Sequence, residues 1–198
     1  MGDKTTISVG VNYVFSHSYE VKVLESYALV HPAEKLHQYP SVLEEGDRSG
    51  LYLRVAQQGF ATWIGFFAQG FDSTEVAHGV FSCPDPDWLC VVASGYAYLV
   101  DSTNPQHWIQ VEQRPVAEVR TVPELKLLLF TGFTSITALG ESQKLWTTER
   151  LSWEGIYVTD IHGSCLRGTG WDAIADKEVA FEVDLLTGKS EGGARPGS

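Results

Sequence analysis

The chain has 198 residues, of which 43% are hydrophobic and 20% are charged, so it is long enough to bury a core. This composition excludes a disordered polar chain, and the apolar runs are too short to span a bilayer. The formal net charge is −11, from 14 Lys and Arg against 25 Asp and Glu. The bases are scattered along the chain, whereas a phosphate backbone or an anionic membrane is bound by clustered Lys and Arg. We therefore expect no nucleic acid and no membrane among the partners.

The cysteines and the beginning of the chain predict a cytoplasmic location. No apolar stretch of signal-peptide length follows the first residues. The three cysteines, Cys83, Cys90 and Cys165, are an odd number, which favours reduced thiols over a disulfide framework.

Hydrophobic residues alternate with polar ones along most of the chain, which is the pattern of half-buried strands. Short turn signals separate these segments, among them Asp85-Pro86-Asp87, Ser94-Gly95 and Asn104-Pro105. In chain order, the predicted strands cover residues 7–15, 19–23, 51–55, 60–67, 76–81, 88–93, 96–101, 108–112, 116–120, 126–130, 135–139, 144–149, 155–161, 165–168 and 179–185. Many short strands at such spacing predict an all-β protein.

Two segments depart from the strand pattern. Residues 31–38 have a proline near their start and helix formers after it, which predicts about two turns of helix. The end of the chain, residues 188–198, is rich in Gly, Ser and Pro, which predicts a flexible tail. We therefore expect one all-β domain over residues 1–187, with less regular strands and a connector in 1–49 and repeated meanders in 50–187.

Three segments repeat the same order of strands and turns: residues 79–113, 115–152 and 153–193. Their third strands would be residues 97–101, 135–139 and 180–184, and residues 50–78 would be an earlier, more degenerate copy. Each repeat exposes an apolar face that must be buried against a neighbouring repeat.

The stretch LLFTGFTSITALGESQKLW at 128–146 resembles a blade of the quinoprotein type of β-propeller repeat. VDLLTGK at 183–189 resembles the turn of the next unit. The resemblance covers roughly 110 residues, and it implies local architecture only, because no cofactor ligands of that family can be carried over. We predict repeated antiparallel meanders in a propeller-like arrangement of four or five small blades. A β-sandwich or an open barrel of the same meanders is the alternative.

Two short motifs could hold a metal ion, and each has a simpler explanation. Asp85-x-Asp87 pairs two carboxylates, but interleaved prolines make it a typical turn. His162-x-x-Cys165 has zinc-ligand spacing, but no second pair lies at a suitable distance. We expect no metal and no cofactor.

The candidate binding residues are Trp171, Asp172, His162 and Asp160. Trp171 and Asp172 follow two glycines, so a ring that stacks stands beside a carboxylate that accepts hydrogen bonds; a glycine bulge with a packed tryptophan is the alternative. Asp160 and His162 share one face of a strand, and Cys165 beyond them completes the residue types of a thiol nucleophile, base and orienter. Such close spacing favours coincidence over a triad.

No complete catalytic motif is present, so the leading hypothesis is a non-catalytic binding or scaffolding domain that engages a protein partner through loops on one rim. The alternative is a carbohydrate-active enzyme, a glycoside hydrolase or lyase, or a carbohydrate-binding module. The acid–base pair of such an enzyme would come from Asp160, Asp172, Asp176 or Glu182. Exposure of the six tryptophans would favour ligand binding, and their burial would favour a structural role.

Overall fold

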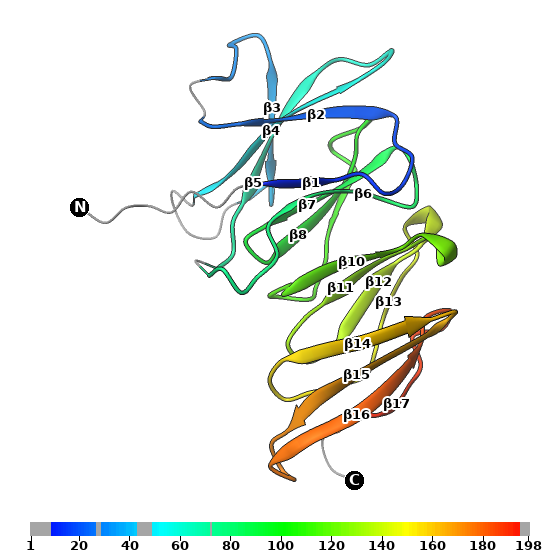
Figure 1. The fold of residues 1–198 in the computed structure, drawn as a ribbon. Coiled ribbons are helices and arrows are strands. Elements are labelled where there is room, and N and C mark those ends of the chain that lie inside the picture. Colours follow the sequence, from blue (N-terminus) through cyan, green and yellow to red (C-terminus); the bar gives the residue numbers. More distant parts are fainter. Residues whose placement is uncertain (1–8, 27–28, 43–48, 72, 195–198) are drawn as a thin grey trace, which may run out of the picture. The chain divides into compact units, whose positions relative to one another are not determined.

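The computed structural model describes residues 9–26, 29–42, 49–71 and 73–194. Residues 7 and 8 of the predicted first strand, and 195–198 of the predicted tail, lie outside these ranges. The chain divides into two compact units, Met1–Glu112 and Gln113–Ser198. The described residues form four β-sheets (Figure 1), so the all-β prediction is confirmed. Among these residues, no helix has the length and apolar character that crossing a bilayer requires.

The first unit contains two sheets. The first sheet has the strand order β2-β4-β5-β3, and the second has the order β1-β6-β7-β8-β9. The strands of the first sheet are β2 (Tyr19–Leu24), β4 (Gly50–Gln57), β5 (Trp63–Ala68) and β3 (Lys35–Tyr39). Those of the second are β1 (Gly10–Asn12), β6 (Gly79–Ser82), β7 (Trp88–Ala93), β8 (Tyr96–Asp101) and β9 (Trp108–Gln110). The edge strands β3 and β1 pair in parallel with β5 and β6, and the other pairs are antiparallel.

The core of the first unit lies between its two sheets. On β4 the residues Leu51, Leu53 and Val55 are buried while those between them are partly exposed, which is the period of two that the sequence shows. Aromatic residues fill much of this core, and Tyr39 stacks on Phe67 with ring centroids 4.7 Å apart. The buried members are Tyr19, Tyr39, Leu51, Leu53, Val55, Trp63, Phe67, Val80, Leu89, Val91, Ala93, Tyr98 and Val100.

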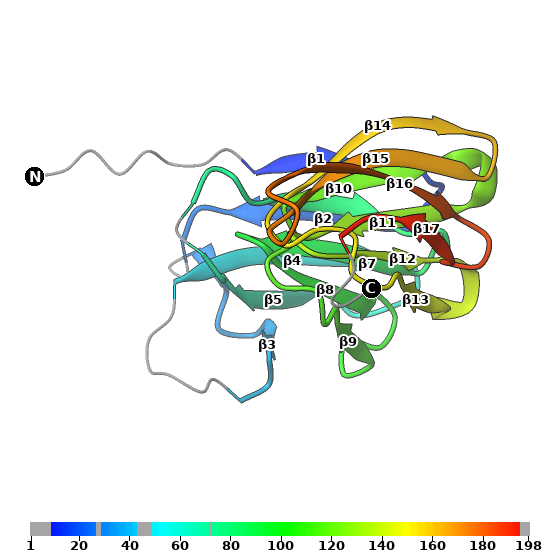
Figure 2. The same ribbon diagram turned by 90° about the horizontal axis from the view of Figure 1, so that it is seen from below.

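The second unit contains two antiparallel sheets whose strands follow chain order. The third sheet consists of β10 (Glu118–Val122), β11 (Leu127–Thr131), β12 (Ile136–Leu139) and β13 (Leu145–Thr147). The fourth consists of β14 (Ile156–His162), β15 (Cys165–Asp172), β16 (Lys177–Asp184) and β17 (Ser190–Gly192). The two sheets lie face to face (Figures 1 and 2) and enclose a core that includes Leu129, Ile136, Leu166, Phe181 and Val183.

The predicted repeat is confirmed by the sheet topology. The expected third strands at 97–101, 135–139 and 180–184 coincide with β8, β12 and β16. Each of them pairs between the second and fourth strands of its own repeat. The degenerate copy at 50–78 supplies β4 and β5, the two central strands of the first sheet. The described strands form four hydrogen-bonded sheets, one for each repeat, as the prediction of repeated meanders requires, rather than the two sheets of a sandwich or the one continuous sheet of an open barrel.

The helix predicted at 31–38 is wrong, because residues 35–39 form the strand β3. Helix propensity is a weak preference that tertiary contacts override. Here β3 pairs along its whole length with β5, and Tyr39 is buried in the core of the unit.

The predicted flexible tail contains ordered structure. Residues 190–192 form β17, which pairs with β16, and Gly188 and Ala194 are buried. The backbone N–H of Ala194 donates a hydrogen bond to the carbonyl oxygen of Leu151 at 3.0 Å, which fixes the end of the fourth sheet. The prediction of one domain over residues 1–187 stays a prediction.

Candidate functional site

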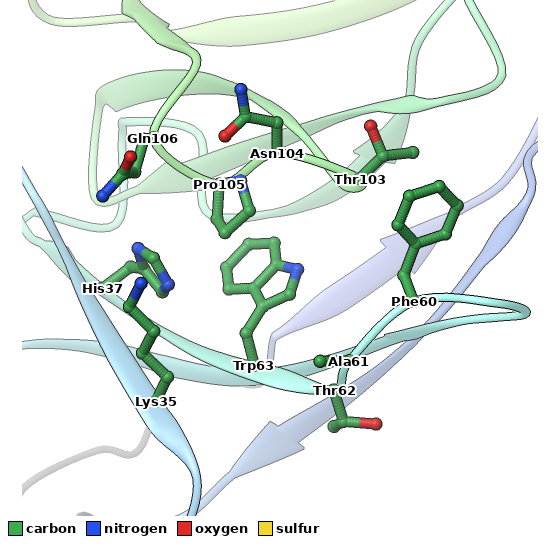
Figure 3. A pocket seen from close by; sticks show the side chains of 10 residues that line it. All are labelled: Lys35, His37, Phe60, Ala61, Thr62, Trp63, Thr103, Asn104, Pro105 and Gln106. Carbon is green, nitrogen blue, oxygen red and sulfur yellow. The ribbon is translucent and has the colours of Figure 1, made fainter.

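The first unit carries an open hollow of about 230 Å³ between two loops and the edge strand β3. We call it the loop pocket (Figure 3). Its walls come from β3, from the β4–β5 connection and β5, and from the β8–β9 connection. It is lined by Lys35, His37, Phe60, Ala61, Thr62, Trp63, Thr103, Asn104, Pro105 and Gln106.

Aromatic rings give the loop pocket its apolar character. Trp63 is only 4% exposed, and its ring lies between the other lining residues in Figure 3. Phe60 at the rim is 52% exposed. The ring of His37 meets the indole of Trp63 edge-on, with centroids 5.7 Å apart. The pocket therefore offers an apolar floor and an exposed apolar rim.

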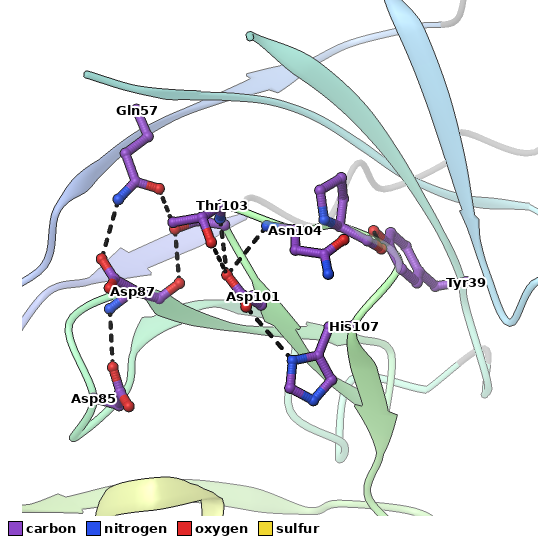
Figure 4. Close-up of polar contacts among 10 residues, drawn as sticks. Tyr39, Gln57, Asp85, Asp87, Asp101, Thr103, Asn104 and His107 are labelled. Atoms are coloured by element: carbon purple, nitrogen blue, oxygen red, sulfur yellow. Dashed lines mark hydrogen bonds and ion pairs between the residues drawn. The ribbon is translucent and has the colours of Figure 1, made fainter. Parts of the chain in front are cut away.

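The β8–β9 loop is held in place by the carboxylate of Asp101 (Figure 4). Its Oδ1 accepts hydrogen bonds from the backbone N–H of Thr103 at 2.9 Å and from that of Asn104 at 3.2 Å. The hydroxyl of Thr103 donates a further bond to the same atom at 2.7 Å. This Asx turn forms because Asp side chains bond the backbone two or three residues ahead. The loop is therefore shaped before any ligand arrives.

Two contacts tie this loop to the first sheet. The phenol of Tyr39 donates to the carbonyl oxygen of Pro105 at 2.6 Å. The indole Nε1 of Trp63 donates to the carbonyl oxygen of Ser102 at 2.9 Å. Both donors come from strands of the first sheet, so the pocket wall and the pocket floor are connected by hydrogen bonds as well as by packing.

The charges of the loop pocket are set by Lys35 and His37, which are two residues apart on β3. Burial lowers the pKa of His37, and the ammonium group of Lys35 lowers it further. His37 is therefore neutral at pH 7, and Lys35 is the cation of the rim.

The residues singled out in the sequence lie on the fourth sheet, in the second unit, and the structure separates them into two groups. His162 stands opposite Cys165 in the register of β14 and β15, and Asp160 stands opposite Arg167. Trp171 and Asp172 lie at the far end of β15. At about 3.3 Å per residue, the four positions from Arg167 to Trp171 span roughly 13 Å. These four candidates therefore do not form one site.

Each of these groups has a structural explanation as well. Asp172 accepts hydrogen bonds from the backbone N–H of Ile174 at 2.9 Å and of Ala175 at 3.2 Å, which makes it a turn residue. The thiol of Cys165 lies 3.7 Å from a carboxylate oxygen of Glu182. The hydrogen-bond partner of the Cys165 thiol is therefore Glu182 on the neighbouring strand, and among the described residues neither His162 nor Asp160 makes a hydrogen bond to the thiol.

The carboxyl groups considered for acid–base catalysis lie on an open face. Asp160 and Glu182 are exposed and flank Arg167, whose Nε donates to Glu182 Oε1 at 2.8 Å. This bond lowers the pKa of Glu182 and keeps it ionised, whereas a general acid needs a raised pKa. Asp176 lies exposed in the turn beside Asp172. This arrangement does not favour the hydrolase alternative.

The short motifs considered for metal binding are turn and sheet residues in the structure. Asp85 Oδ1 accepts from the backbone N–H of Asp87 at 3.2 Å, and Asp87 Oδ1 accepts from the amide of Gln57 at 3.0 Å (Figure 4). Within the described ranges, no three His, Cys, Asp or Glu side chains gather closely enough to share a metal ion.

Of the six tryptophans, Trp63 and Trp88 are buried, Trp108, Trp146 and Trp153 are partly buried, and Trp171 is 36% exposed.

The sequence did not predict the residues of the loop pocket as a site. The Asn104-Pro105 turn was the one local signal, and nothing in the chain order connects it to Phe60 or His37.

The fold is that of an all-β protein built from four sheets, and its loop pocket is an open hollow between two loops and an edge strand. No family profile and no curated protein matches the chain. Solved structures that are similar to this chain include two at 15% identity. One is a chain of an S. cerevisiae complex of a Dbp5 variant bound to Nup159, a Gle1 variant, IP6 and ADP, with a TM-score of 0.35 over 95% of this chain and 53% of that one. The other is the N-terminal domain of Nup159, with a TM-score of 0.34 over 96% of this chain and 55% of that one.

This chain thus spans about half the length of the solved chains that it matches. Similarity of this size supports no inference about function. The expected likeness to quinoprotein-type blades is limited to repeated sheets of four or five strands, and no sequence family is identified.

Proposed function

We propose that the chain is a non-catalytic binding domain that engages a protein partner through the loop pocket. The observation that carries this proposal is the exposed ring of Phe60 beside the buried floor formed by Trp63, in a hollow whose far wall is a loop held by Asp101. An exposed apolar rim on a pre-shaped pocket is typical of interfaces in which one partner inserts an anchoring side chain.

The size of the loop pocket favours a side chain over a free small molecule. Its volume of about 230 Å³ lies below the roughly 300–1,000 Å³ of pockets that enclose whole ligands. A single apolar side chain of a partner would fill it, and the surrounding loop would contact the partner's backbone. The hydrogen bonds of the β8–β9 loop reduce the entropy that binding would otherwise cost. We also propose a cytoplasmic location, which the three free thiols support.

The proposal is tested by replacing Phe60 with the photo-crosslinking residue p-benzoylphenylalanine and irradiating the protein in an extract of its native cell. Leu186, which is 62% exposed and lies in the other unit, receives the same residue as the matched control. We expect a crosslinked protein at position 60 and none at position 186.

Competition distinguishes a specific partner from random capture. An excess of unlabelled wild-type protein should abolish the crosslink, whereas an excess of the Phe60→Ser variant should leave it. A crosslink that both competitors remove equally, or equal capture at position 186, would contradict the proposal.

A further inference from the structure

The outer face of the fourth sheet carries two exposed aromatic rings close together. Tyr157 on β14 is 70% exposed, and Trp171 on β15 is 36% exposed. Tyr157 pairs with Thr169, two residues before Trp171, so the two rings are diagonal neighbours on one face. Diagonal neighbours on a sheet are near enough for aromatic side chains to contact the same ligand.

Two carboxylates stand beside these rings. Glu178 on β16 is the direct cross-strand partner of Trp171, and Glu154 lies just before β14. A hollow of about 260 Å³ is lined by the two rings and the two carboxylates, together with Gly155, Ile156, Thr169 and Gly170. We call it the aromatic–acidic hollow and define it by Glu154, Tyr157, Trp171 and Glu178.

The backbone beneath the hollow is rigidly held. The N–H of Trp171 donates to the hydroxyl of Ser152 at 2.9 Å, and the carbonyl oxygen of Trp171 accepts from the N–H of Trp153 at 2.8 Å. A side chain at Gly170 would place its Cβ 2.5 Å from the carbonyl oxygen of Leu151, so the strand lies directly on the neighbouring segment. The backbone position of Trp171 is therefore fixed before a ligand binds.

Within the described ranges, no Lys or Arg forms an ion pair with the two carboxylates of the hollow. Among the residues that the structure describes, neither Glu154 nor Glu178 makes an ion pair or a hydrogen bond through its side chain. On the same sheet, Glu182 is neutralised by Arg167 at 2.8 Å. Residues 151–194 hold eight Asp and Glu against three Lys and Arg, a net charge of −5. The surroundings therefore attract a positive group and repel an anion.

We infer that the aromatic–acidic hollow binds a cationic side chain, arginine or lysine, presented by a protein partner. Indole and phenol faces attract cations through their ring quadrupole, and the two carboxylates supply ion pairs at the rim. The chain makes such a contact internally, since the guanidinium carbon of Arg150 lies 4.6 Å from the ring centroid of Trp153. The inference is independent of the loop pocket, which lies in the other unit.

The test uses the full chain labelled with ¹⁵N and follows the indole N–H signal of Trp171, identified as the signal that Trp171→Phe removes. The probes are the capped tripeptides Gly-Arg-Gly and Gly-Lys-Gly, with Gly-citrulline-Gly as the neutral analogue of the arginine peptide. We expect saturable shifts with both cationic peptides, with dissociation constants on the order of 1–10 mM at low salt, and none with citrulline. The affinity should fall as salt is added.

Variants show which side chains bind the arginine peptide. Replacing both Glu154→Gln and Glu178→Gln should weaken the arginine peptide at least about fivefold, because both ion pairs are lost while the rings remain. Glu191→Gln, an exposed carboxylate on β17 that does not line the hollow, is the matched control and should change nothing. Circular dichroism confirms that each variant is folded.

Three results would overturn the inference. They are an equal shift with the citrulline peptide, unchanged affinity in the double variant, and a saturable shift with cellobiose of the same size. The last result would assign the hollow to a neutral sugar.

Discussion

The indole Nε1 of Trp63 donates a hydrogen bond to the backbone carbonyl oxygen of Ser102, and 2.9 Å separates the two atoms. Trp63 belongs to β5 in the first sheet, and Ser102 follows β8 in the second. Both residues are buried, so water cannot replace either partner. This one bond connects the floor of the loop pocket to the loop that forms its wall.

Removal of this bond should destabilise the protein. Trp63→Phe keeps an aromatic ring but leaves the Ser102 carbonyl buried without its donor, and it also reduces core volume. We expect the free energy of unfolding to fall by about 1–3 kcal/mol, measured by urea denaturation. Trp171→Phe is the matched control, and because its ring is exposed it should change stability by less than about 0.5 kcal/mol. Equal losses in the two variants would contradict this account of Trp63.

Gly188 packs against the ring of Trp146 in a left-handed conformation. Its φ is +74°, and a Cβ there would lie 2.6 Å from Cε3 of Trp146. Gly188→Ala should therefore lower the free energy of unfolding by about 2–4 kcal/mol, from backbone strain together with steric overlap. Gly163→Ala, at φ +57° with no atom near the added Cβ, should lose only about 1 kcal/mol. Thermal or urea unfolding of the two variants separates the steric contribution from the backbone contribution.

The three cysteines should differ sharply in reactivity. Cys83 and Cys90 are buried, and burial raises the pKa of both thiols, whereas Cys165 is partly exposed. Because the thiolate is the reactive form, Ellman's reagent should titrate one thiol in the native protein and three in denaturant. Cys165→Ser should abolish the native reaction. A second fast-reacting thiol in the native protein would contradict this prediction, because it would mean that Cys83 or Cys90 is accessible.

His78 should make stability depend on pH. The backbone N–H of Ser94 donates to His78 Nδ1 at 3.1 Å, so the ring accepts in its neutral form, and burial lowers its pKa. In the unfolded chain the pKa is near 6.5. As the pH falls below about 6.5, the unfolded chain binds a proton that the folded ring resists, so stability present above that pH is lost.

Urea denaturation at pH 7.5 and 5.5 tests this dependence. Wild-type stability should fall between the two values, and His78→Gln should reduce that fall. The fall in stability that remains in the variant is expected from His37, because burial lowers the pKa of that residue as well. An unchanged fall in His78→Gln would mean that His78 does not contribute.

Local patterns predicted the strands and their order well. The Ser94-Gly95 turn was expected between two apolar runs, and both residues have positive φ, as a tight hairpin between β7 and β8 requires. The repeat of strand and turn patterns predicted the strand at 135–139, which is the equivalent of β8 in the third sheet. These features follow from contacts between residues near each other in the chain, where alternation and turn chemistry are sufficient.

Prediction failed where distant segments decide the structure. Residues 35–39 have helical composition, yet they pair with β5, which begins 28 residues after β3 begins. The chain after Gly188 is rich in small residues, yet β16 and Leu151 order it. In each case a partner elsewhere in the chain provides hydrogen bonds that local propensity does not report.

The same division applies to the sites. Composition and patterning alone established an acidic, all-β chain of repeated meanders, because charge, alternation and turns are properties of neighbouring residues. The two hollows became visible only in the folded chain: Phe60 and Asn104, or Glu154 and Glu178, come together through strand pairing and sheet packing over tens of residues. A binding surface consists of segments that are far apart in the sequence, and burial and strand register determine which of these segments meet.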